Sequence, residues 1–211
     1  MKLIFFTLFL ILQASVTLCQ VEQTMKDTTY QSFDIIDHNL FAKGSSELFS
    51  GQINEKYTDG NSRMVGKAVN GKLEGKVTIY YRNGAKKSEG IFQNGKKSGN
   101  WDIWHPNSQL KSEGSYVNSF RDGKWVSYYK TGEKYQERYF KNNYNDGVFT
   151  SWYEDGVIRE KGQYYEGMIT GHWYSFYTDK KPRSHILYDK NGNVEIYEMW
   201  LEDGTKVEYG Y

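Results

Sequence analysis

Hydrophobic and polar positions recur in this chain with a period of 24 residues. A glycine opens each unit, with no insertion between one unit and the next, at Gly51, Gly75, Gly99, Gly123, Gly147 and Gly171. Two residues further on stands a large apolar side chain, the tryptophan column, formed by Ile53, Val77, Trp101, Trp125, Phe149 and Trp173. A fixed period of this length indicates a repeat protein, in which each unit buries its apolar residues against its neighbours.

Further aromatic columns follow within each unit. Five residues after the glycine lies the ring column, which begins at Lys56 and continues with Tyr80, Trp104, Tyr128, Trp152 and Phe176. The next residue forms the tyrosine column, Tyr57, Tyr81, His105, Tyr129, Tyr153 and Tyr177. Seventeen residues after the glycine stand Ala68, Phe92, Tyr116, Phe140, Tyr164 and Tyr188. Because these columns hold together over six copies, the frame is the strongest signal in the sequence.

Turn-forming dipeptides lie at two places in a unit. Asp59-Gly60 is an example of the first place, and Asn70-Gly71, about half a unit later, is an example of the second. Such pairs favour the positive φ angles of tight hairpin turns. Each unit is therefore predicted to form two short antiparallel strands with a turn at each end. Two units lack the glycine at the first place, and we expect looser turns or another turn type there, at Asn107-Ser108 and Asp179-Lys180.

The predicted fold class is all-β, an elongated antiparallel β-meander or solenoid ribbon of 24-residue hairpin repeats. Strands lie about 4.8 Å apart, so each two-stranded unit should advance the ribbon by about 10 Å. Side chains alternate along a strand, which places the tryptophan and tyrosine columns on one face, predicted to be buried. The ring column then points the other way, unless a β-bulge breaks the alternation.

The two ends of the chain depart from the repeat. Residues 20–43 are predicted to form a leader and an N-terminal cap, with Ile35-Ile36 and Leu40-Phe41 as its apolar residues. The six units occupy residues 44–194, and residues 195–211 are expected to form a C-terminal capping hairpin. Terminal units of repeat arrays must differ in this way, because they cover an end that has no neighbour.

The first 19 residues resemble a secretory signal peptide. Met1-Lys2 precedes a short apolar run over residues 3–12, which is too short for a membrane span of about 20 residues. Cleavage after Cys19 would export the protein to a periplasmic, cell-surface or secreted location. Lipid anchoring at Cys19 is a second reading, although Leu18 is larger than the residue such a motif requires, and an uncleaved anchor is a third.

Composition and charge exclude several function classes. Lys plus Arg number 27 against 26 for Asp plus Glu, so no global basic field favours nucleic acid as a partner. Aromatic residues make up 17% of the chain, which is far from a disordered composition. The single cysteine rules out an intramolecular disulfide framework and a cysteine-rich zinc site.

Two charged columns lie in the second half of each unit. The basic column, twelve residues after the glycine, is Arg63, Lys87, Lys111, Tyr135, Arg159 and Arg183. The acidic column, two residues later, is Val65, Glu89, Glu113, Glu137, Lys161 and His185. Residues two apart on a strand share a face, so both columns are expected side by side. They could pair with each other across strands, or form a track for an anionic glycan or a partner.

No catalytic, cofactor or metal motif stands out. The four histidines, His38, His105, His172 and His185, show no metal-ligand spacing. Aromatic rows beside carboxylates can bind and cleave sugars, but acids such as Asp102 and Glu154 simply follow the repeat. We therefore predict a protein that is not an enzyme, with no cofactor and no metal site. A hydrolase is kept as the third hypothesis.

Segments such as Gly123–Gly132 and Glu74–Gly84 resemble the variant MORN repeat, and Leu48-Phe49-Ser50-Gly51 is similar to the usual entry into such an array. The resemblance covers about residues 40–194. It implies a scaffold that binds proteins, and sometimes lipids, without shared catalytic residues. The variant is common in bacterial exported proteins and in YwqK-type proteins labelled as antitoxins.

The leading functional hypothesis is an exported scaffold that binds a protein or a cell-surface polymer through one face of the ribbon. An antitoxin-like neutraliser of a toxin is the alternative, and an export leader argues against it. Exposed aromatic rows mark binding surfaces. The candidate binding residues are therefore those of the ring column, Tyr80, Trp104, Tyr128, Trp152 and Phe176.

Overall fold

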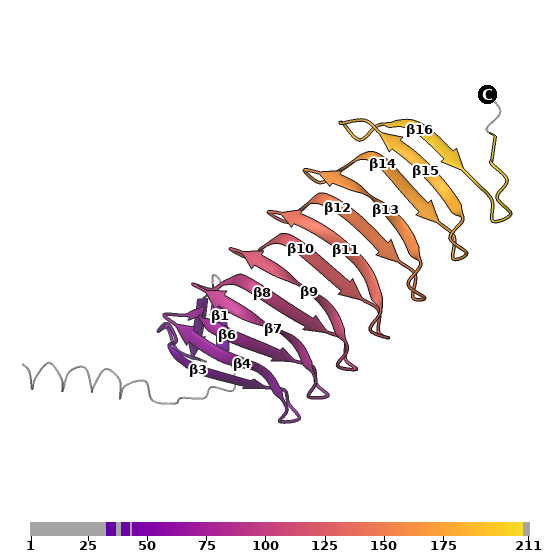
Figure 1. Ribbon diagram of the computed structural model, residues 1–211. Coiled ribbons are helices and arrows are strands. Elements are labelled where there is room, and N and C mark those ends of the chain that lie inside the picture. Colours follow the sequence, from indigo (N-terminus) through magenta and orange to yellow (C-terminus); the bar gives the residue numbers. More distant parts are fainter. Residues whose placement is uncertain (1–32, 37–38, 43, 209–211) are drawn as a thin grey trace, which may run out of the picture.

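The computed structural model describes residues 33–36, 39–42 and 44–208. The predicted signal peptide at residues 1–19, with Cys19, lies outside these residues, as do His38 and Tyr209. The described part consists of strands and turns (Figure 1). Its strands are β1 (Phe33–Ile36), β2 (Asn39–Ala42), β3 (Gly51–Lys56), β4 (Ser62–Val69), β5 (Lys72–Leu73), β6 (Gly75–Tyr80), β7 (Lys86–Gln93), β8 (Lys96–Trp104), β9 (Leu110–Val117), β10 (Phe120–Tyr128), β11 (Lys134–Lys141), β12 (Tyr144–Trp152), β13 (Ile158–Tyr165), β14 (Met168–Phe176), β15 (Pro182–Tyr188) and β16 (Val194–Met199).

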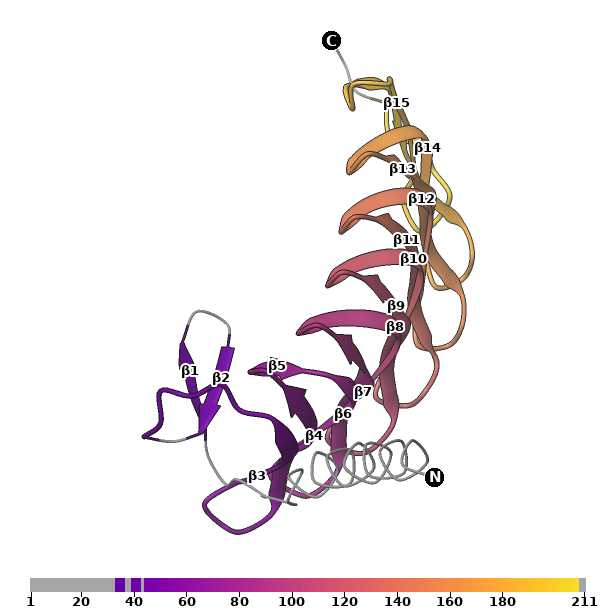
Figure 2. The ribbon, with the colours of Figure 1, turned by 90° about the vertical axis from the view of Figure 1, so that its left-hand side faces the viewer.

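The repeat folds into one antiparallel meander. Strands β3 to β16 form a 14-stranded sheet in which neighbours in the sequence are neighbours in space, with the short β5 paired to β4. Its two edge strands, β3 and β16, lie at opposite ends of an elongated array (Figure 1). The strands are strongly curved in the perpendicular view (Figure 2). The predicted all-β class, with antiparallel hairpin repeats, is confirmed.

The glycine that opens each unit adopts a backbone conformation that other residues rarely reach. Its φ is positive in all six units, for example 74° at Gly75 and at Gly123. The pairing between β9 and β10 also shifts register between Asp122 and Val126, beside this glycine. Only glycine reaches such angles without a steric penalty, which explains why this position repeats.

All six residues of the tryptophan column are buried. Trp101 is 1% exposed, Val77 is fully buried, and Trp125 is 7% exposed. Aromatic rings of the neighbouring column surround the indoles: Phe92 and Tyr116 meet Trp101 edge to face, with ring centroids 5.3 and 5.9 Å away. A single sheet therefore buries its large side chains against the next unit instead of against a second layer.

Glycines on the adjacent strand make room for these indoles. Trp125 lies flat against Gly114, where a Cβ atom would fall 2.2 Å from the indole ring. The indole then donates a hydrogen bond from Nε1 to the carbonyl of Ser115 at 3.1 Å. The same contact recurs where Gly90 faces Trp101. These glycines form a second glycine column that was not predicted from the sequence and comprises Gly66, Gly90, Gly114 and Gly162.

One extra residue interrupts the return strand of every unit. Between β10 and β11, Ser127 faces Gln136 but Tyr128 faces Lys134, so Tyr135 is left over as a β-bulge. The same shift occurs in all six units. The extra residues are the members of the basic column, Arg63, Lys87, Lys111, Tyr135, Arg159 and Arg183.

This bulge makes the expectation of adjacent basic and acidic columns wrong. Lys87 lies over the ring of Tyr81, with its Nζ 5.7 Å from the centroid. Glu89 lies on the opposite face of the sheet and pairs with Lys86. Residues two apart share a face only in a regular strand, and the extra residue turns the basic column to the other side.

The turns without glycine also differ from expectation. Ser108 and Lys180 adopt φ angles of 68° and 70°, close to the 83° of Gly84 at the same place in its unit. The turn hydrogen bond is kept as well, from the Ser108 amide to the His105 carbonyl at 3.0 Å. The turn type therefore stays the same, because the pairing of the flanking strands imposes it.

Residues before the first unit close the N-terminal end of the sheet. Leu40 and Phe49, 7% and 5% exposed, pack with Ile53 and Ala68 in one apolar cluster. The Leu40 amide donates to the carbonyl of Gly71 at 2.7 Å, which ties β2 to the turn between β4 and β5. At the other end, the bridge between Trp200 and Lys206 begins a hairpin.

Candidate binding face

The five candidate residues of the ring column, Tyr80, Trp104, Tyr128, Trp152 and Phe176, lie on the face of the sheet opposite to the tryptophan column. Each is half-buried. They share this face with Glu89, Glu113 and Glu137, and we call it the glutamate face; the opposite side is the tryptophan face. The alternation along the outgoing strands holds as expected, because the bulge lies in the return strand.

Ion pairs hold the glutamate face together at Glu89. Its carboxylate accepts from Lys76 at 3.0 Å, from Lys86 at 2.9 Å and from the hydroxyl of Thr78 at 2.9 Å. Burial alone would raise the pKa of Glu89, but these three hydrogen bonds prevail and lower it to about 2. The carboxylate is therefore charged at any physiological pH.

The same arrangement recurs two units later at Glu137, which pairs with Lys124 at 2.9 Å and Lys134 at 3.8 Å. Between the two, Glu113 accepts a hydrogen bond of 2.6 Å from the hydroxyl of Tyr128. Burial and this hydrogen bond raise the pKa of Tyr128 to about 12. Tyr128 thus stays a neutral hydrogen-bond donor.

Lysines cover part of the rings. The Nζ atom of Lys86 lies 5.5 Å from the centroid of Trp104, and that of Lys134 lies 5.7 Å from Trp152. A cation over an aromatic face is attracted by the negative face of the ring. The rings of Trp104 and Trp152 are therefore half-buried and bordered by positive charge.

A shallow hollow of about 440 Å³ lies in the middle of the glutamate face. Asp102, Glu113 and Tyr128 line it, together with Lys124 and Lys134. Burial raises the pKa of Asp102, and the nearby charges of Glu113 and Glu89 raise it further. The hollow offers hydrogen-bond donors and acceptors beside an aromatic ring, which suits binding of a polar ligand or partner.

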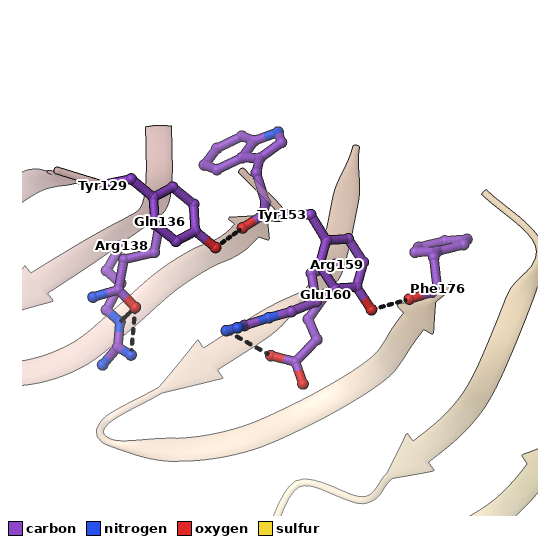
Figure 3. A network of polar contacts seen from close by, with 8 residues as sticks. Tyr129, Gln136, Arg138, Tyr153, Arg159, Glu160 and Phe176 are labelled. Carbon is purple, nitrogen blue, oxygen red and sulfur yellow. Dashed lines mark hydrogen bonds and ion pairs between the residues drawn. The ribbon is translucent and has the colours of Figure 1, made fainter. Parts of the chain in front are cut away.

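The tyrosine column, on the other face, ties each unit to the next. Each hydroxyl donates to the carbonyl of the ring-column residue one unit further on, as Tyr129 does to Trp152 at 2.8 Å and Tyr153 to Phe176 at 2.9 Å (Figure 3). In the third unit, where His105 replaces the tyrosine, its Nε2 contacts the carbonyl of Tyr128 at 3.1 Å. These half-buried rings are therefore structural links between units.

Two histidines that are thirteen residues apart meet in the last unit. His172 Nδ1 lies 2.8 Å from His185 Nε2, and His185 Nδ1 lies 2.9 Å from a carboxylate oxygen of Glu198. Tyr174 stacks on His185, with centroids 4.7 Å apart. A spacing of thirteen residues matches no motif, so it did not indicate this contact. The repeat does indicate it, because His172 and His185 occupy the positions that Lys76 and Glu89, which form an ion pair, occupy in the second unit.

The described residues contain no group of three or more His, Cys, Asp or Glu side chains placed to hold a metal ion. In the same part of the chain, no helix has the length and apolar character needed to cross a membrane. What the glutamate face offers is stacking, hydrogen bonding and ion pairing.

The fold defines a class of protein, the open antiparallel repeat ribbon, in which every unit contributes equivalent side chains to a continuous face. Four successive stretches match the family model described as the MORN repeat variant, at residues 73–94, 97–118, 121–142 and 145–165. The chain therefore carries four MORN-variant repeats. The first and last units share their geometry, because Tyr57 and Tyr177 make the same interunit hydrogen bond.

No curated protein matches the chain. Among solved structures, one titled "Crystal structure of GtfA/B complex bound to UDP and GlcNAc" is similar, with 14% identity and a TM-score of 0.19. The match covers 70% of this chain and 26% of that chain, so this chain spans about a quarter of its length. At that score the likeness supports no conclusion about function.

Proposed function

We propose that this protein is a non-catalytic, exported repeat scaffold that binds a protein or a cell-surface polymer through the glutamate face. The observation that carries this proposal is the ring column, which presents one half-buried aromatic residue in each of the last five units on an open sheet face. Trp and Tyr are among the residues that most often dominate binding energy. MORN repeats are generally non-catalytic scaffolds, which supports the same conclusion.

The decisive comparison is between tryptophans of the two faces. Trp104→Ala and Trp152→Ala should weaken capture of the partner in pull-downs from cell-envelope fractions, with only a modest loss of stability. Trp101→Ala and Trp125→Ala should instead lower the free energy of unfolding by about 3–5 kcal/mol, because each empties a core aromatic site. Tyr165→Ala, which removes an exposed ring outside the column, serves as the matched control.

Equal loss of stability in all four tryptophan variants would show that both columns are core, and the proposal would fail. Export is tested separately by the intact mass of the natural protein, which should lack residues 1–19. A cytosolic form that keeps Met1 would contradict export and would favour the antitoxin-like alternative.

A further inference from the structure

The tryptophan face carries a second row of functional groups at the end of each hairpin nearer the first turn. It combines rings of the tyrosine column with side chains that the bulge turns to this face. We call it the tyrosine–lysine row, and in the central units it consists of Tyr81, Lys87, His105, Lys111, Tyr129, Lys130 and Tyr135. The five candidate residues of the ring column do not belong to it, whereas Lys87, Lys111 and Tyr135 come from the basic column.

The cations of this row differ from those of the glutamate face. On the glutamate face, Lys86 and Lys134 are each held within 4 Å of a glutamate. Within residues 44–208, Lys87, Lys111 and Lys130 have no carboxylate at ion-pair distance. The central part of the row is therefore an unneutralised positive strip.

Aromatic and small polar side chains form a hollow of about 520 Å³ in this strip. Tyr129 and Tyr135 meet edge to face, with centroids 5.0 Å apart, and form one wall. His105 supplies a further ring, while the hydroxyls and amide of Ser112, Ser127 and Gln136 also line the hollow. Lys111 and Lys130 belong to the lining, as does one acid, Glu154, which accepts a hydrogen bond from Thr131.

The distance between equivalent lysines of the row determines how far apart the charges of a matching ligand should be. Lys87 and Lys111 are one unit apart, which is two strands or about 10 Å along the ribbon. An extended disaccharide is about as long as this step. Flat tyrosine rings suit the apolar faces of sugar rings, and lysine ammonium groups suit carboxylates.

We propose that the tyrosine–lysine row binds a linear acidic polysaccharide that carries one negative charge on every second sugar. The rings support alternate sugars, and the lysines pair with the charges between them. This site lies on the face opposite to the ring column, so it is independent of the partner proposed above.

Titration calorimetry of the full chain with hyaluronan oligosaccharides tests this, since that polymer has one carboxylate per disaccharide. Binding should weaken as salt is added, because exposed charge pairs are screened. Lys87→Gln combined with Lys111→Gln should lower the affinity about tenfold, the loss expected for two exposed ion pairs. Tyr135→Leu should also weaken binding, since it removes one wall of the hollow.

The matched control is Lys86→Gln combined with Lys134→Gln, which removes the same charge from the other face and should change the affinity less than about twofold. Neutral dextran should not bind. Equal losses in both lysine pairs would contradict the assignment of the face. Absence of hyaluronan binding at low salt, or binding only to vesicles of phosphatidylserine, would overturn the proposal. Thermal melts confirm that each variant is folded.

Discussion

Single glycines do two different things in this protein. Gly75 and its counterparts provide a positive φ at the start of each unit. Gly90, Gly114 and Gly162 have ordinary backbone angles and are needed because an indole occupies the space of a Cβ atom, whereas Gly66 in the same column faces Val77. In the fourth unit Arg138 replaces this glycine, and the residue that faces it in the next unit is Phe149 rather than tryptophan.

Gly114→Ala is therefore expected to destabilise the protein by about 3 kcal/mol, the upper range for overpacking, because the indole of Trp125 must move. Gly84→Ala is the control, since its Cβ would meet nothing within 4 Å although φ is 83°. That change should cost only about 1 kcal/mol. Urea denaturation measures both, and equal losses would mean that the indole of Trp125 accommodates the added methyl group at little cost.

Glu89 links stability to pH. Its pKa is lowered from 4.5 to about 2 in the folded protein, so its contribution is complete above pH 4.5 and disappears as the pH falls through about 2. Glu89→Gln should lower the free energy of unfolding by about 1–3 kcal/mol at pH 7, allowing for partial exposure. Near pH 2 the variant and the parent should converge. Thermal melts at a series of pH values measure this. If the difference in stability between the variant and the parent did not change with pH, the charge of Glu89 would have no role.

At the scale of the strands, the bulge decides which face each charge takes. Lys86 and Lys87 are neighbours in the sequence, yet Lys86 pairs with Glu89 and Lys87 covers Tyr81 on the other face. The extra residue also brings Tyr135 against Tyr129. In the second unit the hairpin thus separates a neutralised charged face, with Lys86 and Glu89, from a face that carries Lys87.

The hydroxyl of the tyrosine column holds one hairpin to the next. Tyr153→Phe removes the donor to the Phe176 carbonyl and should cost about 1 kcal/mol, the net value of a typical hydrogen bond. Tyr165→Phe, at a ring that is 56% exposed, should be neutral in the same thermal melts. If both variants behaved alike, the interunit hydrogen bond would not contribute to stability.

At the scale of the whole molecule, stability is a sum over units and their interfaces. Deleting residues 99–122 removes one whole unit and brings Tyr81 to the place from which it can reach the carbonyl of Tyr128. The shortened chain should fold with a lower melting temperature. Deleting Ser127 alone should be more damaging, because it moves Tyr128 and the following Tyr129 to the opposite faces of the sheet. Circular dichroism melts measure both variants. A lower melting temperature for the deletion of residues 99–122 than for the deletion of Ser127 would refute the 24-residue repeat.

The periodicity of the sequence was sufficient to predict the meander, the buried tryptophan column and the opposite ring column. These follow from the strict alternation of side chains between the tryptophan column and the ring column, where each outgoing strand pairs regularly with the return strand that follows, as Trp125, Val126 and Ser127 do with Arg138, Glu137 and Gln136. The bulge at Lys87 and its equivalents could not be predicted, because an added residue in a charged strand leaves no trace in an apolar pattern. For the same reason the charged columns were assigned to one face incorrectly.

The sequence by itself determined the hairpin repeat, since its glycines, turn dipeptides and aromatic columns act within one unit or between adjacent units. Only the tertiary structure decided what depends on pairing across strands. In the structure Gly114 lies against the indole of Trp125, and Ser108 adopts the positive φ of a glycine. His172 contacts His185, thirteen residues away in the sequence. The physical reason is that register, and not sequence distance, determines which side chains meet in a sheet.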